Sequence, residues 1–111
     1  MTSIRERLQA DLPAAMKARD AATVSVLRTT LAALSNAEAV EQGDAGALGT
    51  RGVYSSEAAR RELSSDDERT VVQREIEELL ASAEESEDAG QTDEAEILRG
   101  KAEVLTRYLD I

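Results

Sequence analysis

Apolar residues recur every three to four positions along most of this chain, which is the spacing of one buried face of an α-helix. The first apolar stripe consists of Ile4, Leu8, Leu12 and Met16. Ser3 and Glu6 form a capping box at its start, in which each side chain accepts a hydrogen bond from a backbone N–H of the first turn. We predict a helix over 4–18 that is kinked at Pro13 but continues beyond it.

A second stripe predicts a helix over 21–42, with Asp20 as its N-cap and Gly43 as the residue that ends it. Its predicted buried positions are Val24, Leu27, Leu31 and Leu34. The apolar positions of this helix lie on one face, so it is expected to pack against the first helix. The two-residue connection 19–20 makes that packing antiparallel.

A third helix is predicted over 65–89, after Ser64, with acidic residues in its first turn and Gly90 at its end. A fourth is predicted over 93–109, with Thr92 as its N-cap. The predicted buried stripes are Val72, Ile76, Leu79 and Ala83 in the third helix, and Leu98, Ala102, Leu105 and Leu109 in the fourth. We interpret Gly100 as a place where a neighbouring helix approaches closely.

These elements predict an all-α fold in one domain spanning 1–111. The short connections 19–20 and 90–92 make two antiparallel helical hairpins, which pack face to face as a four-helix bundle. A long, partly extended connection joins the second and third helices. No run approaches the roughly 20 apolar residues that a membrane-spanning helix needs, and no signal peptide is evident.

Glycine-rich residues 43–52 raise the question of a phosphate-binding loop. Their spacing matches neither the dinucleotide fingerprint nor the P-loop, no strand precedes them, and they contain no lysine. We interpret 43–52 as a flexible link. The following stretch VYSSEAARREL offers Val53, Tyr54 and Leu63 as apolar anchors, so we expect it to lie extended across the bundle.

The net charge of −10 is unevenly distributed along the chain. Residues 1–36 carry five basic and three acidic side chains, whereas residues 37–111 carry eight basic and twenty acidic ones. An acidic surface repels polyanions, so contact with a nucleic acid would have to use the first half and the neighbouring connection.

The composition also limits the chemistry. The chain contains no cysteine and no histidine, which removes disulfides, zinc–thiolate sites and the usual general base near neutral pH. We predict no catalytic residue, no metal site and no cofactor, and a soluble cytoplasmic protein. The carboxylates of the third helix form an acidic outer face, which consists of Glu75, Glu77, Glu78, Glu84, Glu85, Glu87 and Asp88.

Three stretches together resemble the GatB/YqeY family. Residues 4–38, IRERLQADLPAAMKARDAATVSVLRTTLAALSNAE, resemble its opening hairpin. Residues 62–80, ELSSDDERTVVQREIEELL, resemble its capped third helix with a Q-[KR]-E-I core. Residues 84–109, EESEDAGQTDEAEILRGKAEVLTRYL, resemble its ending, which closes on Tyr-Leu.

The resemblance implies a tRNA-associated accessory module, because the related region of the glutamine-dependent aminoacyl-tRNA amidotransferase helps to hold tRNA. The label of carbon–nitrogen ligase with glutamine as donor follows from that similarity, and no catalytic residue is carried over. In the family, Tyr-Leu is usually followed by proline and a second small helical domain, whereas Asp110 and Ile111 follow here. We therefore expect weak tRNA binding.

Two functional readings remain open. In the first, the chain works with tRNA or with an amidotransferase or other tRNA-handling complex. Its predicted nucleic-acid contacts are Lys17, Arg19, Arg28, Arg51, Arg60 and Arg61. In the second, it is an acidic protein-interaction module that binds a basic protein partner and has no RNA role. No membrane contact is expected in either reading.

Overall fold

The computed structural model describes the backbone of residues 2–47 and 63–109, and the side chains of 2–39 and 63–109. These ranges contain four helices and no strand, which confirms the predicted all-α fold. The helices are α1 (Ile4–Lys17), α2 (Ala21–Ala47), α4 (Ser65–Asp88) and α5 (Thr92–Thr106).

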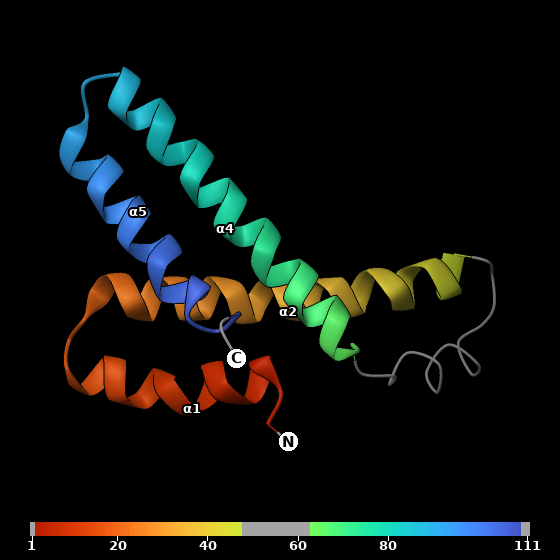
Figure 1. Cartoon of the computed structure of the whole chain (residues 1–111). Helices are drawn as coiled ribbons and strands as arrows, with labels where there is room; N and C mark the ends of the chain where they lie inside the picture. Colours follow the sequence, from red (N-terminus) through yellow and green to blue (C-terminus); the bar gives the residue numbers. More distant parts are fainter. Residues whose placement is uncertain (1, 48–62, 110–111) are drawn as a thin grey trace.

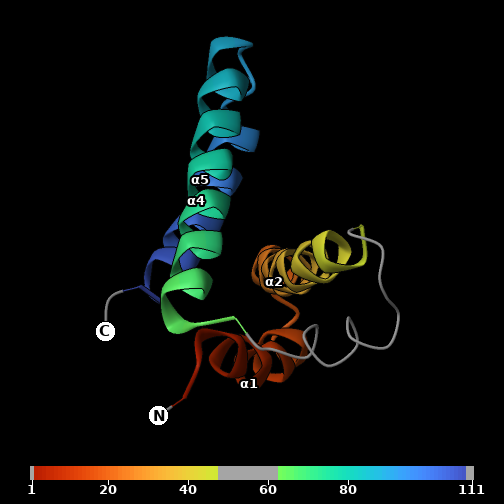
Figure 2. The same ribbon diagram turned by 90° about the vertical axis from the view of Figure 1, so that its right-hand side faces the viewer.

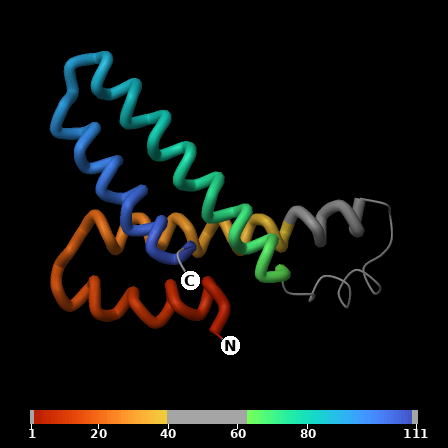
Figure 3. Tube along the Cα trace, viewed as in Figure 1, coloured from red at the N-terminus to blue at the C-terminus, as the bar shows by residue number. Residues whose placement is uncertain are grey.

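The helices form the two predicted antiparallel hairpins, α1–α2 and α4–α5 (Figure 1). The α4–α5 hairpin stands across the α1–α2 hairpin, and its turn projects well beyond it (Figure 2). The other end of α5 returns to the start of α1, so the two ends of the described chain meet (Figure 3). The two hairpins therefore pack against each other at one end of α4–α5, whereas the other end projects beyond α1 and α2.

Local side-chain caps explain where three helices begin. In α1 the backbone N–H of Glu6 donates to Ser3 Oγ over 3.1 Å, and that of Ser3 donates to Glu6 Oε1 over 2.9 Å, as predicted. In α4 Ser64 and Asp67 form the same reciprocal capping box. At the start of α2, Asp20 Oδ1 accepts from the backbone N–H of Thr23 over 3.1 Å. These bonds satisfy N–H groups that have no partner inside the helix.

Several predicted helix ends are wrong. Helix α2 continues to Ala47, past Gly43, which therefore does not end it. The N-cap of α5 is Gln91 and not Thr92, and the Gln91 side chain makes no capping bond. Helix α5 ends at Thr106 and is followed by turn residues. The prediction for Gly90 is confirmed, because its φ of +82° is a conformation that favours glycine.

The core contains most of the predicted stripe positions. Leu8, Leu27, Leu34, Val72 and Leu105 are the largest apolar side chains that are fully buried. Two expectations are wrong. Met16 is 49 % exposed and Ala15 is buried in its place. At the C-terminal end of α1 the buried face therefore passes through position 15 and not through position 16. Gly100 faces open space, so no helix approaches it.

The long connection lies mostly outside the described residues. Of the predicted link 43–52, the first part up to Ala47 is helical, and the remainder is outside the described range. The proposed anchors Val53 and Tyr54 are outside it too. Leu63 is described, and it packs half-buried against the core as expected.

Candidate functional site

Three of the predicted nucleic-acid contacts lie at the α1–α2 turn. Lys17 is the last residue of α1, and Arg19 follows it in the turn with a φ of +59°. Arg28 is exposed on α2, and its Nη2 lies 3.7 Å from Met16 Sδ, which places it beside the end of α1. The hairpin thus brings together residues that are 11 positions apart in sequence, and we call Lys17, Arg19 and Arg28 the basic turn.

The side chains of the basic turn keep their charges exposed to solvent. All three are exposed, and none takes part in the ion pairs found among the described side chains. The nearby acidic residue is Asp20, whose carboxylate accepts hydrogen bonds from the hydroxyl and the backbone N–H of Thr23. These bonds lower the pKa of Asp20, so it remains ionised. The basic turn therefore presents three exposed cations, and the carboxylate within it is already engaged by Thr23.

The other predicted contacts cannot be placed on this surface. Arg51, Arg60 and Arg61 lie outside the described residues. The predicted six-residue nucleic-acid interface therefore stays a prediction, and the structure describes three of its members.

Two arginines that sequence reasoning did not single out hold the end of α5. Arg7 Nη1 donates to the backbone oxygen of Tyr108 over 3.1 Å, and its guanidinium carbon lies 4.8 Å from the centre of the Tyr108 ring. Arg69 Nη1 donates to the backbone oxygen of Leu109 over 3.1 Å. Positive charge at a helix C-terminus is favourable. Both arginines are thus engaged in the fold itself.

Tyr108 completes this junction from the other side. Its hydroxyl donates to Asp11 Oδ2 over 2.5 Å, and its side chain is 7 % exposed. Burial and the hydrogen bond to Asp11 raise the pKa of Tyr108, so the phenol stays neutral. The Tyr-Leu ending noticed in the sequence was the available signal for this contact, because such a tyrosine at a helix end needs a partner when buried.

The projecting half of the α4–α5 hairpin, residues 75–98, has a different electrostatic character, and we call it the arm. It contains ten acidic residues and no basic one. Most of these carboxylates are exposed, including Glu77, Glu84 and Glu85. Glu75 is half-buried, and burial followed by repulsion from Glu78 raises its pKa. The arm is therefore a strongly negative surface, as predicted for the outer face of α4, except that Glu75 lies beside Ala33 and Ala37 of α2 and not on that face.

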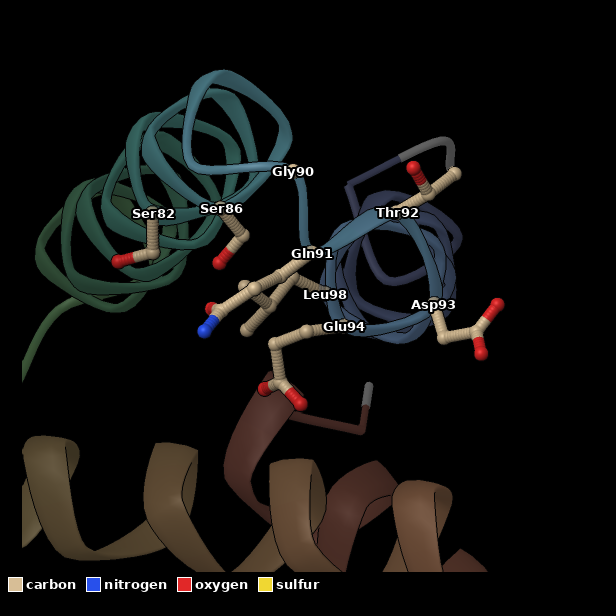
Figure 4. A pocket seen from close by; sticks show the side chains of 8 residues that line it. All are labelled: Ser82, Ser86, Gly90, Gln91, Thr92, Asp93, Glu94 and Leu98. Atoms are coloured by element: carbon tan, nitrogen blue, oxygen red, sulfur yellow. The ribbon is translucent and has the colours of Figure 1, made fainter.

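An open hollow of about 870 Å³ lies at the tip of the arm, between α4 and α5. Ser86 and Gln91 extend into the space between the two helices, and Leu98 lies beneath them (Figure 4). Glu94 points from α5 toward α2, whereas Asp93 points away from the hollow (Figure 4). The hollow thus combines uncharged donors and acceptors, an apolar surface and one carboxylate at its edge.

Neither a cluster of metal-binding side chains nor a membrane-spanning helix occurs in the described part of the chain. No group of three acidic side chains there converges on a point where a metal ion could bind. Among the described helices, none combines the length and the apolar character needed to cross a membrane.

Comparison with known proteins gives one finding. The family described as Yqey-like protein matches residues 5–110, which is nearly the whole chain. Comparisons with curated proteins and with solved structures gave no match.

Proposed function

Because this chain belongs to the Yqey-like protein family, we propose that it is a helical accessory module that works with tRNA, close to glutamine-dependent aminoacyl-tRNA amidation. The extent of the family match, over residues 5–110, supports this proposal. So does the resemblance of its motifs to the region of the amidotransferase that helps to hold tRNA. A tRNA role would place the protein in the cytoplasm.

In this proposal the module contributes binding and no catalysis. The chain contains neither histidine nor cysteine, so it cannot supply the Cys–His or Ser–His pairs used in nucleophilic catalysis. The carbon–nitrogen ligase activity associated with the family's relatives would then belong to a partner enzyme. The module would present RNA to that enzyme or hold the complex together.

The basic turn is the observation that carries the proposal. Lys17, Arg19 and Arg28 are exposed, lie at or beside the α1–α2 turn, and form no ion pair with the described side chains. Such side chains bind phosphates and release the counterions that surround RNA. The arm, with its ten carboxylates, belongs to the other hairpin and would repel RNA from its own surface.

Titration of labelled tRNA at several salt concentrations tests the proposal. We expect weak binding of the wild type, with a Kd of about 1 µM or higher at physiological salt, and a steep loss of affinity as salt rises. The double variant Lys17→Glu, Arg19→Glu should lose binding. The matched control Arg99→Glu, Arg107→Glu changes the net charge equally on exposed positions of the other hairpin, and should retain most of it.

Two further variants extend the test to predictions made from the sequence. Reversal of Arg60 and Arg61 should abolish binding, whereas Glu84→Lys with Glu85→Lys should strengthen it. Equal losses in the basic-turn variant and its control would contradict the assignment of the basic turn. No binding at any salt would favour the alternative, an acidic protein-interaction module with no RNA role.

A further inference from the structure

The tip of the arm combines features that an ordinary solvated helix surface lacks. Ile97 is 48 % exposed, although it is one of the largest apolar side chains of α5. It is adjacent to Leu98, which lines the hollow, and one helical turn from Glu94 at the edge of the hollow. An apolar side chain, an open hollow and a carboxylate therefore lie together.

The charge of the arm limits what can bind there. Residues 75–98 carry ten acidic side chains and no basic one, so no cation within the arm offsets them. Polyanions such as RNA are repelled from such a surface, and cationic segments are attracted and steered toward it. The described cations that flank the arm in sequence are Arg74 before it and Arg99 after it, and Arg99 pairs with Glu87.

We propose that the tip of the arm is a docking surface for a basic, amphipathic segment of a partner protein. A lysine or arginine of that segment lies in the hollow, with its aliphatic part on Leu98 and its cation at Glu94. An apolar residue of the same segment packs on Ile97. This inference goes beyond the proposed tRNA role, because it uses the other hairpin and the opposite charge, and neither depends on the other.

The lining of the hollow fits a cationic side chain better than an anion or a purely apolar group. Ser86 and Gln91 offer acceptor oxygens in the space between α4 and α5, and Glu94 supplies a negative charge. Long basic side chains bury their methylene groups on apolar surface while keeping the charged end hydrated. The surface is small and open, which suits a weak and reversible complex.

NMR titration of the labelled full chain with two synthetic peptides tests the proposal. The first peptide, LKKLLKKLLKKL, is basic and amphipathic. The second, SKKSSKKSSKKS, has the same charge without the leucines. We expect the first to bind with shifts concentrated at the backbone amides of residues 91–98, and the second to bind more weakly at the same place.

Variants of α5 separate a specific surface from general attraction. Glu94→Gln should weaken binding of the leucine peptide about threefold, as expected for one partly exposed ion pair. The matched control Glu96→Gln removes the same charge from an exposed position of the same helix, and should weaken it less than about 1.5-fold. Ile97→Ala should weaken the leucine peptide about fivefold and leave the serine peptide unchanged.

Several results would overturn the proposal. Equal effects of Glu94→Gln and Glu96→Gln, or shifts spread over all acidic residues, would mean that only net charge attracts the peptides. A lack of binding by both peptides would exclude the surface as a docking site. A concentration-dependent dimer in sedimentation, lost on Glu94→Gln, would mean that a second copy of this chain occupies the tip.

Discussion

The two ends of the α4–α5 hairpin are built from different side chains. At the base, where the hairpin meets α1 and α2, Val72 and Leu105 are fully buried and Tyr108 is 7 % exposed. In the arm the fully buried apolar residues are Ala83 and Ala95, while Leu80 and Ile97 are about half exposed. Large buried side chains join the two hairpins at the base, whereas small ones let α4 and α5 pair closely in the arm.

Polar contacts between distant parts of the chain show the same difference. At the base, Glu68 Oε1 accepts from the backbone N–H of Ile4 over 3.0 Å, and Tyr108 donates to Asp11. In the arm, the contact between distant residues that the described side chains make is the exposed pair of Glu87 and Arg99. The large buried side chains and the long-range polar contacts are thus concentrated at the base, which leaves the arm free to present its surface.

The largest expected effect is the loss of a core side chain at the base. Leu105 is fully buried, so Leu105→Ala should lower the free energy of unfolding by about 3 kcal/mol through lost burial and the cavity left behind. The matched change in the arm, Leu80→Ala, removes a side chain that is 47 % exposed. It should cost less than about 1 kcal/mol. Urea denaturation of both variants measures the difference, and similar losses would contradict the comparison.

A smaller effect is expected from Glu68, which is 6 % exposed and joins the starts of α1 and α4. Glu68→Ala leaves the backbone N–H of Ile4 without its acceptor, which should cost about 2 kcal/mol. Glu68→Gln keeps an oxygen that can accept this bond, so it should cost less than about 1 kcal/mol. Urea denaturation at pH 7 compares the two. Equal losses would show that the hydrogen bond contributes little and that packing determines the effect.

Local features of the fold could be predicted from the sequence. The capping box at Ser3 and Glu6 and the N-cap Asp20 depend only on residues three positions apart, and both are confirmed. Glycine predicted helix ends less reliably than the capping residues predicted helix starts. Gly43 lies inside α2, because its cost of about 1 kcal/mol relative to alanine is small enough for the rest of a long helix to offset.

Contacts between the hairpins could not be predicted in this way. Glu68 and Ile4 are 64 positions apart, and their hydrogen bond depends on how one hairpin crosses the other. The sequence predicts that the helix dipole favours the three acidic residues in the first turn of α4, and nothing local distinguishes Glu68, the buried one. In the basic turn, Lys17 and Arg19 are only two positions apart in sequence. The position of Arg28 beside Met16 requires the packing of the hairpin itself.

Tyr108 offers a test of the base that depends on pH. Tyr108→Phe removes the hydrogen bond to Asp11 and should cost about 1 kcal/mol at pH 7. The pKa of Tyr108 is raised in the folded state, first by burial and then by that bond. The contribution of Tyr108 to the free energy of unfolding is therefore complete below the ordinary tyrosine pKa near 10 and is lost as the pH rises above it. Denaturation at pH 8, 10 and 11 should show a steeper alkaline loss for the wild type than for the variant, and parallel curves would exclude this role.

The smallest expected change in the free energy of unfolding comes from a substitution in the arm, and this change is an increase. Burial and the neighbouring Glu78 raise the pKa of Glu75, so its ionised form is less favourable in the folded protein than in the unfolded chain. By linkage, the stability that the Glu75 carboxyl group contributes is present at low pH and is lost as the pH rises through its folded-state pKa.

Glu75→Gln should therefore increase the free energy of unfolding at pH 7, by only about 0.3 kcal/mol because the half-exposed carboxylate is screened by solvent. At pH 3, where the wild-type carboxyl is protonated, the two proteins should be equally stable. Glu96→Gln is the control for the general relief of negative charge in the arm, and its gain should be smaller since Glu96 is exposed. If Glu96→Gln stabilises the protein as much as Glu75→Gln, the effect comes from the net charge of the arm. A gain confined to Glu75→Gln would instead assign it to the partly buried position beside Glu78, where desolvation adds to repulsion.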